Sequence, residues 1–281
     1  MAIYSEKAEK ATGLQLSDAH FHLGFVSNPV DFAVDAQRAG VPIFAASVTP
    51  SEYRDTKGAL CWVAAPLQPV GDSASIKLAV GLHPWWVSAD ERRLAEVLRA
   101  FDGALPETQY VGEVGLDFSK RRIATRDAQL RSFRHIANAC AKDGGKVLSI
   151  HCVKAYDDVL SILDSSGCFA SCTCIFHWFS GSFQQLEQAA DAGCFFSVGA
   201  RMLETKKGSE YAKAVPLRKL LLETDAPAAI DPEQEHPSVL YSYDQMRLQL
   251  VETLRRLARI RGIGESELAA IVQQNACEVF C

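Results

Sequence analysis

The chain has 281 residues, of which 48% are hydrophobic and 22% charged, so it can bury a large core in one barrel-sized domain or two smaller ones. Its formal net charge of −5 excludes a protein that coats nucleic acid through a broad basic surface, although a local basic mouth is compatible with it. No linker or charge run interrupts the middle. This favours a single domain over residues 1–281, with a core from about residue 14 and a polar N-terminal extension over 1–13.

The N-terminal segment is polar and lacks the apolar stretch of a signal peptide, and no run approaches the roughly twenty apolar residues that a membrane span needs. We therefore expect a soluble cytoplasmic protein without a membrane partner. The nine cysteines include no Cys-x-x-Cys pair, so they are expected to be reduced thiols buried as small apolar groups. The sequence does not specify the oligomeric state, and a monomer is the working expectation.

Eight short apolar runs along the chain are predicted to be β-strands. Their nearly continuous hydrophobicity, without clean alternation, is typical of strands buried on both faces of a parallel sheet. The predicted strands cover residues 14–17, 42–48, 77–81, 110–112, 146–150, 173–176, 194–198 and 219–222.

Helical spacing of apolar residues separates most of these runs. It is clearest from Leu94 to Phe101 and from Val30 to Val34, and Ser182 opens a capping box before another helix. The spacing after the second and seventh strands is less regular. Strand followed by helix, eight times over, predicts an α/β fold of the (β/α)8 TIM-barrel type, because parallel neighbours need a crossover helix.

Two more helices are predicted after the last strand. Met246, Leu250, Leu254 and Leu257 share one helical face, and the second helix carries a similar face that begins at Leu268. We expect these C-terminal helices to pack outside the barrel or across its floor.

A His-x-His pair follows the first predicted strand. His20 and His22 are two residues apart, so on a strand both point to the same side and can hold one metal ion. The alternative for such a pair is a set of exposed or hydrogen-bonded histidines, so the pair alone decides little.

A carboxylate, Glu113, lies at the end of the fourth predicted strand between Gly112 and Gly115. Burying it alone would cost several kcal/mol unless a cation compensates. A pair of metal ions bridged by Glu113 is the simplest compensation, and a salt bridge to a buried arginine or lysine is the alternative. The same test applies to Asp225, which follows the last strand and precedes Pro227.

Further metal-binding side chains follow other strands. His151 and His177 end the fifth and sixth predicted strands, and each alone would more often be a hydrogen-bonded core histidine. Barrel active sites, however, are built at the carboxyl ends of the strands, where all these residues converge. His83, after the third strand, is predicted to support a ligand or to contact a leaving or phosphate oxygen.

Five motifs together resemble the TatD family of metal-dependent deoxyribonucleases. The likeness runs from about Asp18 to Phe280 and keeps the order of the family's motifs. They are Asp18-Ala19-His20-Phe21-His22-Leu23, Gly81-Leu82-His83-Pro84, Gly112-Glu113-Val114-Gly115-Leu116-Asp117, His177-Trp178-Phe179-Ser180-Gly181 and Glu223-Thr224-Asp225-Ala226-Pro227.

The resemblance implies an amidohydrolase-like barrel that trims DNA, mainly single-stranded, from the 3′ end with divalent ions as cofactors. Two metals are implied, and imidazole-rich ligation suits Zn or Mn at least as well as Mg. The implied ligands are His20, His22 and Asp225 for one metal, His151 and His177 for the other, and Glu113 as the bridge between them.

Two positions depart from the family pattern. Trp85 stands where the family usually has a second histidine in Gly-x-His-Pro-His, and Val153 stands where it usually has arginine, with Lys154 one place later. Both positions are implied to touch the substrate phosphate. The departures therefore affect the expected substrate and rate more than metal binding.

The expected chemistry is hydrolysis of a phosphodiester, with Asp225 as the general base. Basic residues on loops at the catalytic face are expected to draw in the anionic substrate, and Trp85 is expected to stack on a base or to plug the barrel top. Alternatively, the run of basic residues at 120–122 is only solvated surface without a role in substrate binding. The predicted substrate-binding residues are Trp85, Lys120, Arg121, Arg122, Lys154 and Arg201.

Two other functions remain open. A barrel of this type can hydrolyse an ester, lactone, amide or phosphotriester with the same metals, although no lysine takes the place of Glu113 as a carbamylated bridge. The departures at Trp85 and Val153 would also fit a partner protein that kept the metal cage and lost turnover.

Overall fold

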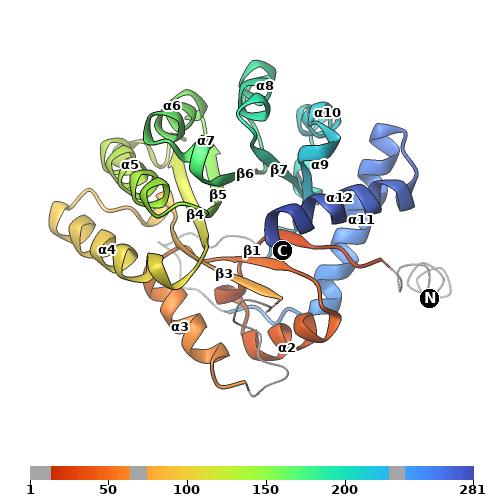
Figure 1. The fold of residues 1–281 in the computed structure, drawn as a ribbon, viewed down its shortest axis with the longest axis horizontal. Coiled ribbons are helices and arrows are strands. Elements are labelled where there is room, and N and C mark those ends of the chain that lie inside the picture. Colours follow the sequence, from red (N-terminus) through yellow and green to blue (C-terminus); the bar gives the residue numbers. More distant parts are fainter. Residues whose placement is uncertain (1–13, 64–74, 228–237) are drawn as a thin grey trace.

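The computed structural model describes residues 14–63, 75–227 and 238–281. Eight strands pair side by side in the order β1 to β8, all neighbours parallel, with helices around the outside (Figure 1). The predicted (β/α)8 barrel is therefore confirmed, whereas the predicted extension over 1–13 lies outside the described residues. The strands are β1 Asp18–Phe21, β2 Ile43–Ala46, β3 Ile76–Leu82, β4 Tyr110–Asp117, β5 Val147–Val153, β6 Thr173–His177, β7 Phe195–Val198 and β8 Leu220–Leu222.

Helices follow every strand, including β2 and β7, after which the sequence pattern was less regular. Side chains cap several of them: Ser182 and Ser242 each form a capping box, and Thr49 accepts a hydrogen bond from the backbone of Glu52. The α-helices are α2 Pro29–Ala39, α3 Pro50–Leu60, α4 Glu91–Ala104, α5 Arg126–Asp143, α6 Tyr156–Ser166, α7 Cys168–Ser171, α8 Phe183–Asp191, α9 Ala200–Leu203, α10 Lys206–Ala214, α11 Tyr243–Arg261 and α12 Glu265–Phe280. Short 3₁₀ turns are η1 Leu23–Phe25, η2 Pro84–Trp86, η3 Leu105–Glu107, η4 Ile123–Thr125 and η5 Leu217–Lys219.

The first strand lies later in the chain than residues 14–17, where it was predicted. β1 contains two polar residues, Asp18 and His20, which made this segment a poor strand candidate by composition. Both are nonetheless fully buried, and Asp18 accepts hydrogen bonds from the backbone and hydroxyl of Thr224 at 3.1 and 2.6 Å. Tertiary hydrogen bonds therefore stabilise a strand that local preference disfavours.

The segment after β8 brings the two edges of the sheet together. The backbone N–H of Asp225 donates to His20 at 3.0 Å, and that of His22 donates to Ala226 at 2.8 Å. The strand β8 ends at Leu222, as predicted, and Asp225 lies three residues beyond it. These hydrogen bonds fix Asp225 next to the two histidines of β1.

The floor of the barrel is apolar. Inward residues near the start of each strand form one cluster, and Phe280 of α12 packs into it against Phe44 and Tyr110. Figure 1 shows α12 lying across the centre of this end of the barrel, while α11 packs on the outside against α2, α9 and α10. Both predicted positions for the C-terminal helices are thus occupied, one by each helix.

The fourth strand is longer than predicted and contains a bulge. Val80 pairs with Val111 and Leu82 with Val114, so β4 has one residue more than β3 over this stretch, and the same shift occurs against β5. Glu113 therefore lies inside the strand, where the bulge turns it toward the barrel interior. The hydrophobic run predicted a strand that ends at residue 112, because a charged residue normally marks the end of a buried strand.

The bulge is bonded to a strand that is not its neighbour. Ser47, just after β2, exchanges two backbone hydrogen bonds with Gly112 and Glu113 at 2.8 and 2.9 Å. The chain passes directly over Gly81 of β3, where an added Cβ would lie only 1.9 Å from the carbonyl oxygen of Ser47. The absence of a side chain at Gly81 is what allows β2 to reach β4.

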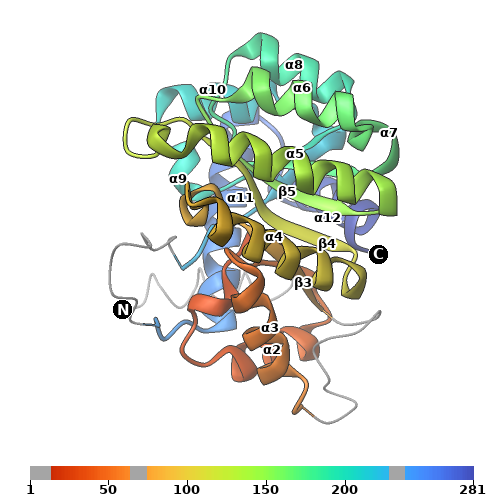
Figure 2. The ribbon, with the colours of Figure 1, turned by 90° about the vertical axis from the view of Figure 1, so that its left-hand side faces the viewer.

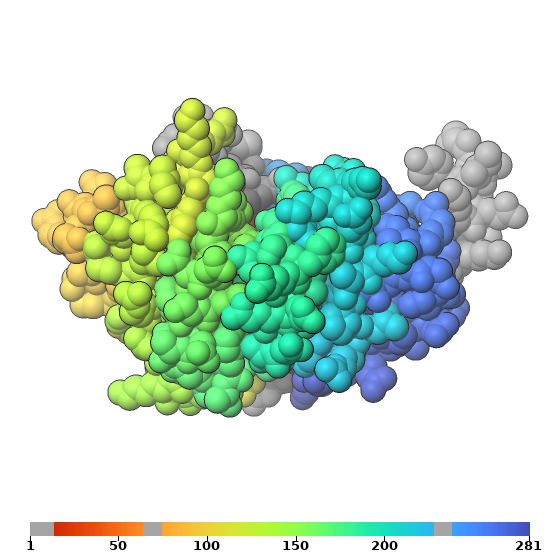
Figure 3. Space-filling view, turned by 90° about the horizontal axis from the view of Figure 1, so that it is seen from above, coloured from red at the N-terminus to blue at the C-terminus, as the bar shows by residue number. Residues whose placement is uncertain are grey.

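The loops at the other end of the barrel face away from the C terminus. The segment that joins β4 to α5 projects on the side opposite the C terminus in Figure 2, and it stands out as a yellow-green projection in Figure 3. No described helix combines the length and the apolar composition that crossing a membrane would require. All nine cysteines are free thiols, but the expectation that they are buried is wrong for Cys61, Cys277 and Cys281, which are exposed.

Candidate metal centre

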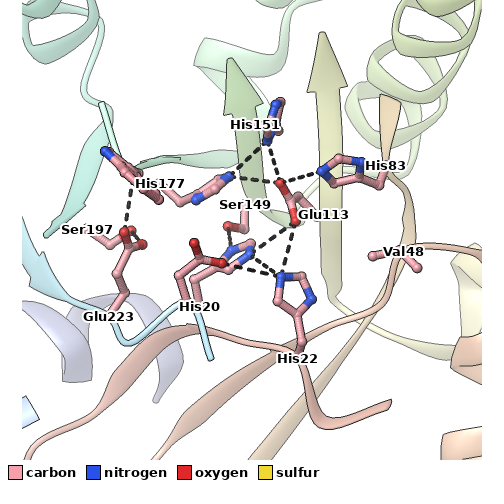
Figure 4. A network of polar contacts seen from close by, with 12 residues as sticks. His20, His22, Val48, His83, Glu113, Ser149, His151, His177, Ser197 and Glu223 are labelled. Carbon is pink, nitrogen blue, oxygen red and sulfur yellow. Dashed lines mark hydrogen bonds and ion pairs between the residues drawn. The ribbon is translucent and has the colours of Figure 1, made fainter. Parts of the chain in front are cut away.

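The six predicted metal ligands converge at the mouth of the barrel, and Figure 4 labels the histidines and Glu113 among them. They come from β1 and the residue directly after it, from β4, β5 and β6, and from the segment after β8, and every one of them is buried. The six are His20, His22, Glu113, His151, His177 and Asp225.

Glu113 occupies the centre of the group. Its Oε1 lies 2.7 Å from Nδ1 of His151, 2.9 Å from Nε2 of His177 and 3.0 Å from Nε2 of His83. The alternative reading, a salt bridge to a buried arginine or lysine, does not apply among the described residues, because the charged partners of Glu113 there are imidazoles.

The second carboxylate oxygen of Glu113 faces the other histidine pair. Oε2 lies 3.3 Å from Nε2 of His20 and 3.4 Å from Nε2 of His22, and it accepts no hydrogen bond in the described part of the chain. A buried carboxylate oxygen normally accepts at least one hydrogen bond. An orphaned oxygen between imidazole nitrogens fits a cation that would lie between these groups.

Asp225 completes the pair on β1. Its Oδ1 lies 3.5 Å from Nε2 of His22, and His20, His22 and Asp225 each offer one ligand atom within 4.8 Å of the others. On the far side of the carboxylate, Oδ2 lies 3.5 Å from a guanidinium nitrogen of Arg201. The structure thus brings together the three residues of the first ligand set that the family resemblance implies.

Mutual contacts set the charge states. Burial would raise the pKa of Glu113, yet the imidazoles of His83, His177 and His20 hold it well below its usual range. Burial lowers the pKa of His20 to about 4. For His151, burial acts in the same direction but is outweighed by hydrogen bonds to Asp117 and Glu113, which raise its pKa to about 9. The centre therefore combines ionised carboxylates with at least one neutral imidazole.

His83 lies closer to the centre than predicted. Its Nδ1 accepts a hydrogen bond from the backbone N–H of Trp85 at 3.0 Å, which leaves Nε2 to carry the proton toward Glu113. His83, Glu113 and His151 also offer ligand atoms within 4.8 Å of one another. His83 is therefore near enough to be a ligand, but with its proton on Nε2 and its Nδ1 accepting from Trp85 it supports Glu113 instead.

Several supporting residues were not assigned from the sequence. Ser149 lies 2.7 Å from Nδ1 of His20, and Asp117 lies 3.3 Å from Nε2 of His151. Ser197 donates to Glu223, a fully buried carboxyl whose pKa burial raises. Ser149 and Ser197 alternate with the apolar floor residues of their strands, and this period of two is the signal that could have identified them.

A cavity of about 390 Å³ opens over the centre and is lined by residues from the loops and strand ends that surround it. Trp85 and Arg201 line it, as predicted substrate-binding residues would, and Arg122 lies over the Trp85 ring at 4.8 Å from its centroid. Trp178, which was not assigned a role, also lines the cavity, with the Arg201 guanidinium 4.6 Å from its centroid.

Three of the predicted basic residues lie further out. Lys120, Arg121 and Lys154 are exposed and are not among the residues that line the cavity. The first two belong to the projecting segment between β4 and α5 (Figures 2 and 3). The structure thus places the cations in two groups, one at the cavity wall and one on the outer rim.

The chain is similar to known nucleases along nearly its whole length. The family model described as "TatD related DNase" matches residues 17–281. The "3'-5' ssDNA/RNA exonuclease TatD" of Salmonella typhimurium is 27% identical over 92% of this chain and 98% of its own. The human "Deoxyribonuclease TATDN3" is 25% identical over 72% of this chain and 73% of its own.

Solved structures share the fold. A TatD family hydrolase from Entamoeba histolytica superposes with a TM-score of 0.72 at 16% identity, covering 95% of this chain and 98% of that one. The TatD homologue YJJV from Escherichia coli superposes with a TM-score of 0.66 at 21% identity, covering 95% and 98%. With the family match over residues 17–281 and the ligand-bearing barrel mouth, the chain belongs to the TatD-related DNase family.

Proposed function

We propose that this protein is a divalent-metal-dependent 3′-to-5′ exonuclease that hydrolyses the phosphodiester bonds of single-stranded DNA. The observation that carries the proposal is the buried Glu113 carboxylate, with each oxygen facing a separate group of imidazoles. Membership of the TatD family supports hydrolysis of phosphodiesters. The polarity and the single-stranded substrate follow those of the Salmonella relative, which is named a 3'-5' ssDNA/RNA exonuclease.

Two metal ions fit the donor set. His20, His22 and Asp225, whose ligand atoms lie within 4.8 Å of one another, would hold one, His151 and His177 would hold the other, and Glu113 would be shared by both. Oxygen-only coordination, which Mg prefers, is not what this pocket offers, so Zn or Mn suits it at least as well. When bound, the metals would neutralise the phosphoryl oxygens and lower the pKa of an attacking water toward about 7.

Asp225 is the best placed residue to accept the proton of that water. It lines the cavity, and although burial opposes its ionisation, its hydrogen bond with His22 and the charges of the nearby imidazoles lower its pKa. An ionised carboxylate with one oxygen directed toward Arg201 can take a proton while its other oxygen faces His22. His83 would hold Glu113 in place through its Nε2–H, next to the reacting phosphate.

The cavity provides both charge and stacking for a nucleotide chain. Arg201 on the Trp178 ring and Arg122 on the Trp85 ring place guanidinium groups against indoles that line the cavity. These four side chains come from the segments that follow β3, β4, β6 and β7. Guanidinium groups bind phosphates, and indoles stack on bases with on the order of 1–3 kcal/mol each.

The remaining cations would act at longer range. Lys120, Arg121 and Lys154 are exposed on the same face, on a protein whose formal net charge is −5. A local positive rim on an acidic protein concentrates an anionic substrate at the mouth without conferring general affinity for DNA. The volume of about 390 Å³ lies at the small end of ligand pockets, which favours one strand end over a duplex.

The test uses metal-free protein reconstituted with Mg, Mn or Zn and a single-stranded oligonucleotide labelled at its 5′ end. We expect a ladder of labelled products that shorten from the 3′ end, and none in the presence of a chelator. A substrate blocked at its 3′ end is the matched control and should persist.

Small carboxylic esters and lactones, tested with the same preparations, separate the other hydrolase classes. If the esters are hydrolysed and the oligonucleotide is not, the proposal is overturned in favour of a different amidohydrolase activity. Protein that binds metal yet leaves every substrate intact would instead be the metal-binding partner protein.

A further inference from the structure

The indole of Trp85 is committed to a contact inside the protein. Its Nε1–H donates to Oδ2 of Asp117 at 2.6 Å, and its backbone N–H donates to Nδ1 of His83. Trp85, the second residue of η2, thus contacts Asp117 at the end of β4, and hydrogen bonds hold both its backbone and its ring. The side chain at this position is therefore held by the protein itself and is not free to follow a substrate phosphate.

Asp117 collects three hydrogen bonds at the end of β4. Besides Trp85, the backbone N–H of Ser119 donates to Oδ1 at 2.8 Å, and Nε2 of His151 lies 3.3 Å from Oδ2. The residue is only 2% exposed, so each of these donors stabilises a carboxylate that water scarcely reaches. Without the indole N–H, Oδ2 would keep His151 as its single partner and could turn away from it.

This carboxylate determines how His151 is presented. With Nε2 held by Asp117, Nδ1 points inward, 2.7 Å from Oε1 of Glu113 and 3.4 Å from Nε2 of His177. A carboxylate that accepts a hydrogen bond from the outer nitrogen of a metal-binding imidazole fixes its tautomer and its orientation. Trp85, Asp117 and His151 therefore form a chain of contacts that leads to one ligand set.

The other ligand set has its own support. Nδ1 of His20 lies 2.7 Å from the hydroxyl of Ser149, and its Nε2 points toward His22 and Glu113. Figure 4 shows Ser149 beside His20. The Trp85 ring is connected to His20 and His22 only by a longer route among the described residues, through the His83 ring and then Glu113, whereas Asp117 alone separates it from His151.

We infer that Trp85 is a positioning residue which, through Asp117, holds His151 as a ligand of one metal only. Ser149 positions His20 in the same way as a ligand of the other metal. The inference rests on the two-metal centre proposed above, but not on the identity of the substrate. It also assigns the tryptophan found in place of the family's usual histidine a task within the metal centre.

The experiment compares Trp85→Phe with Ser149→Ala in metal-free protein titrated with Co(II), followed by the visible absorption of the bound ion and by calorimetry. We expect the wild type to bind two ions. Trp85→Phe should lose about 10–100-fold in affinity at one of them and keep the other, and Ser149→Ala should weaken the opposite one. Trp86→Phe, the same change on the neighbouring residue, is the matched control and should match the wild type.

The inference is overturned if Trp85→Phe binds both ions as the wild type does, if both affinities fall together, or if the wild type binds a single ion. Asp117→Asn removes the carboxylate and keeps its size, so it gives a second route to the same selective loss if Trp85→Phe does not fold. Trp85→His, which restores a ring N–H, should recover part of the affinity. The metal titration contains no DNA, so its result does not depend on nuclease activity. A protein that binds two ions but cuts no oligonucleotide would refute the proposed nuclease function, and the titration would still test the role of Trp85.

Discussion

At the floor of the barrel the inward residues of β6 and β8 are Ile175 and Leu221, and two positions later along the chain they are His177 and Glu223. The same change from apolar to polar occurs along β5 and β7. The floor and the mouth are therefore made by the same strands, and the side chains of both are buried. Different interactions hold the two regions together.

The floor is stable because burial of its side chains removes apolar surface from water, at about 25 cal/mol per Å². The mouth buries carboxylates and imidazoles, and each needs a partner to offset the loss of hydration. Most have one, such as Asp18 with Thr224, but one oxygen of Glu113 does not. The floor therefore contributes stability, while the mouth gives up some stability for a metal-binding centre.

The largest expected effect is at the mouth. Glu113→Gln should lower DNA hydrolysis by about a thousandfold or more, because the neutral amide no longer balances the cations that the centre holds, an interaction worth several kcal/mol. Folding should be retained, since the amide has the size of the carboxylate. Turnover of a labelled oligonucleotide, with circular dichroism as the folding control, measures both, and a variant that keeps a tenth of the activity would contradict the assignment.

The floor should show the opposite pattern. Phe280→Ala removes a fully buried ring from the contact with Phe44 and Tyr110 and should lower the free energy of unfolding by about 3 kcal/mol, measured in urea. Metal affinity at low temperature should stay as in the wild type. Phe183→Ala, at a half-exposed phenylalanine of α8, is the matched control. Equal losses in the two variants would mean that α12 does not close the floor.

The link between the two ends can be tested at Gly81. An alanine there must displace the backbone of Ser47 or Glu113, so Gly81→Ala should destabilise the protein by about 2 kcal/mol and lower metal affinity as well. Gly103→Ala, in α4 with open space around it, should be neutral or slightly stabilising. Urea unfolding and metal titration of both variants give the comparison, which fails if Gly81→Ala keeps the metal affinity of the wild type.

The smallest expected effect concerns a polar group at the margin of the mouth. Burial raises the pKa of Glu52 to about 7, although the backbone N–H of Val48 donates to it. A raised folded-state pKa means that the folded protein holds the proton more tightly, so this contribution to stability is full below about pH 4.5 and is lost as the pH rises through 7.

Glu52→Gln should remove this dependence. Relative to the variant, the metal-free wild type should lose on the order of 1–2 kcal/mol of unfolding free energy between pH 5 and pH 8. Urea unfolding of both proteins at the two pH values measures it. A difference that is independent of pH would show that Glu52 is ionised throughout, as an exposed glutamate would be.

The strands lie along the hydrophobic runs that predicted them, although several of them begin or end at other residues than expected, and two of these differences have a clear physical cause. β1 begins four residues later than expected, because Asp18 and His20 are stabilised by partners far away in sequence. β4 continues past Glu113, because its bulge is bonded to Ser47 on a strand two positions away.

The sequence by itself determined that eight parallel strands carry histidines and carboxylates at one end, since hydrophobic runs and the spacing of His20, His22, Glu113 and Asp225 are local features. Tertiary structure alone decided which nitrogen of each imidazole faces the centre. A tautomer and a ring orientation depend on hydrogen bonds from other strands and loops, and no spacing along one segment encodes the position of a partner on another.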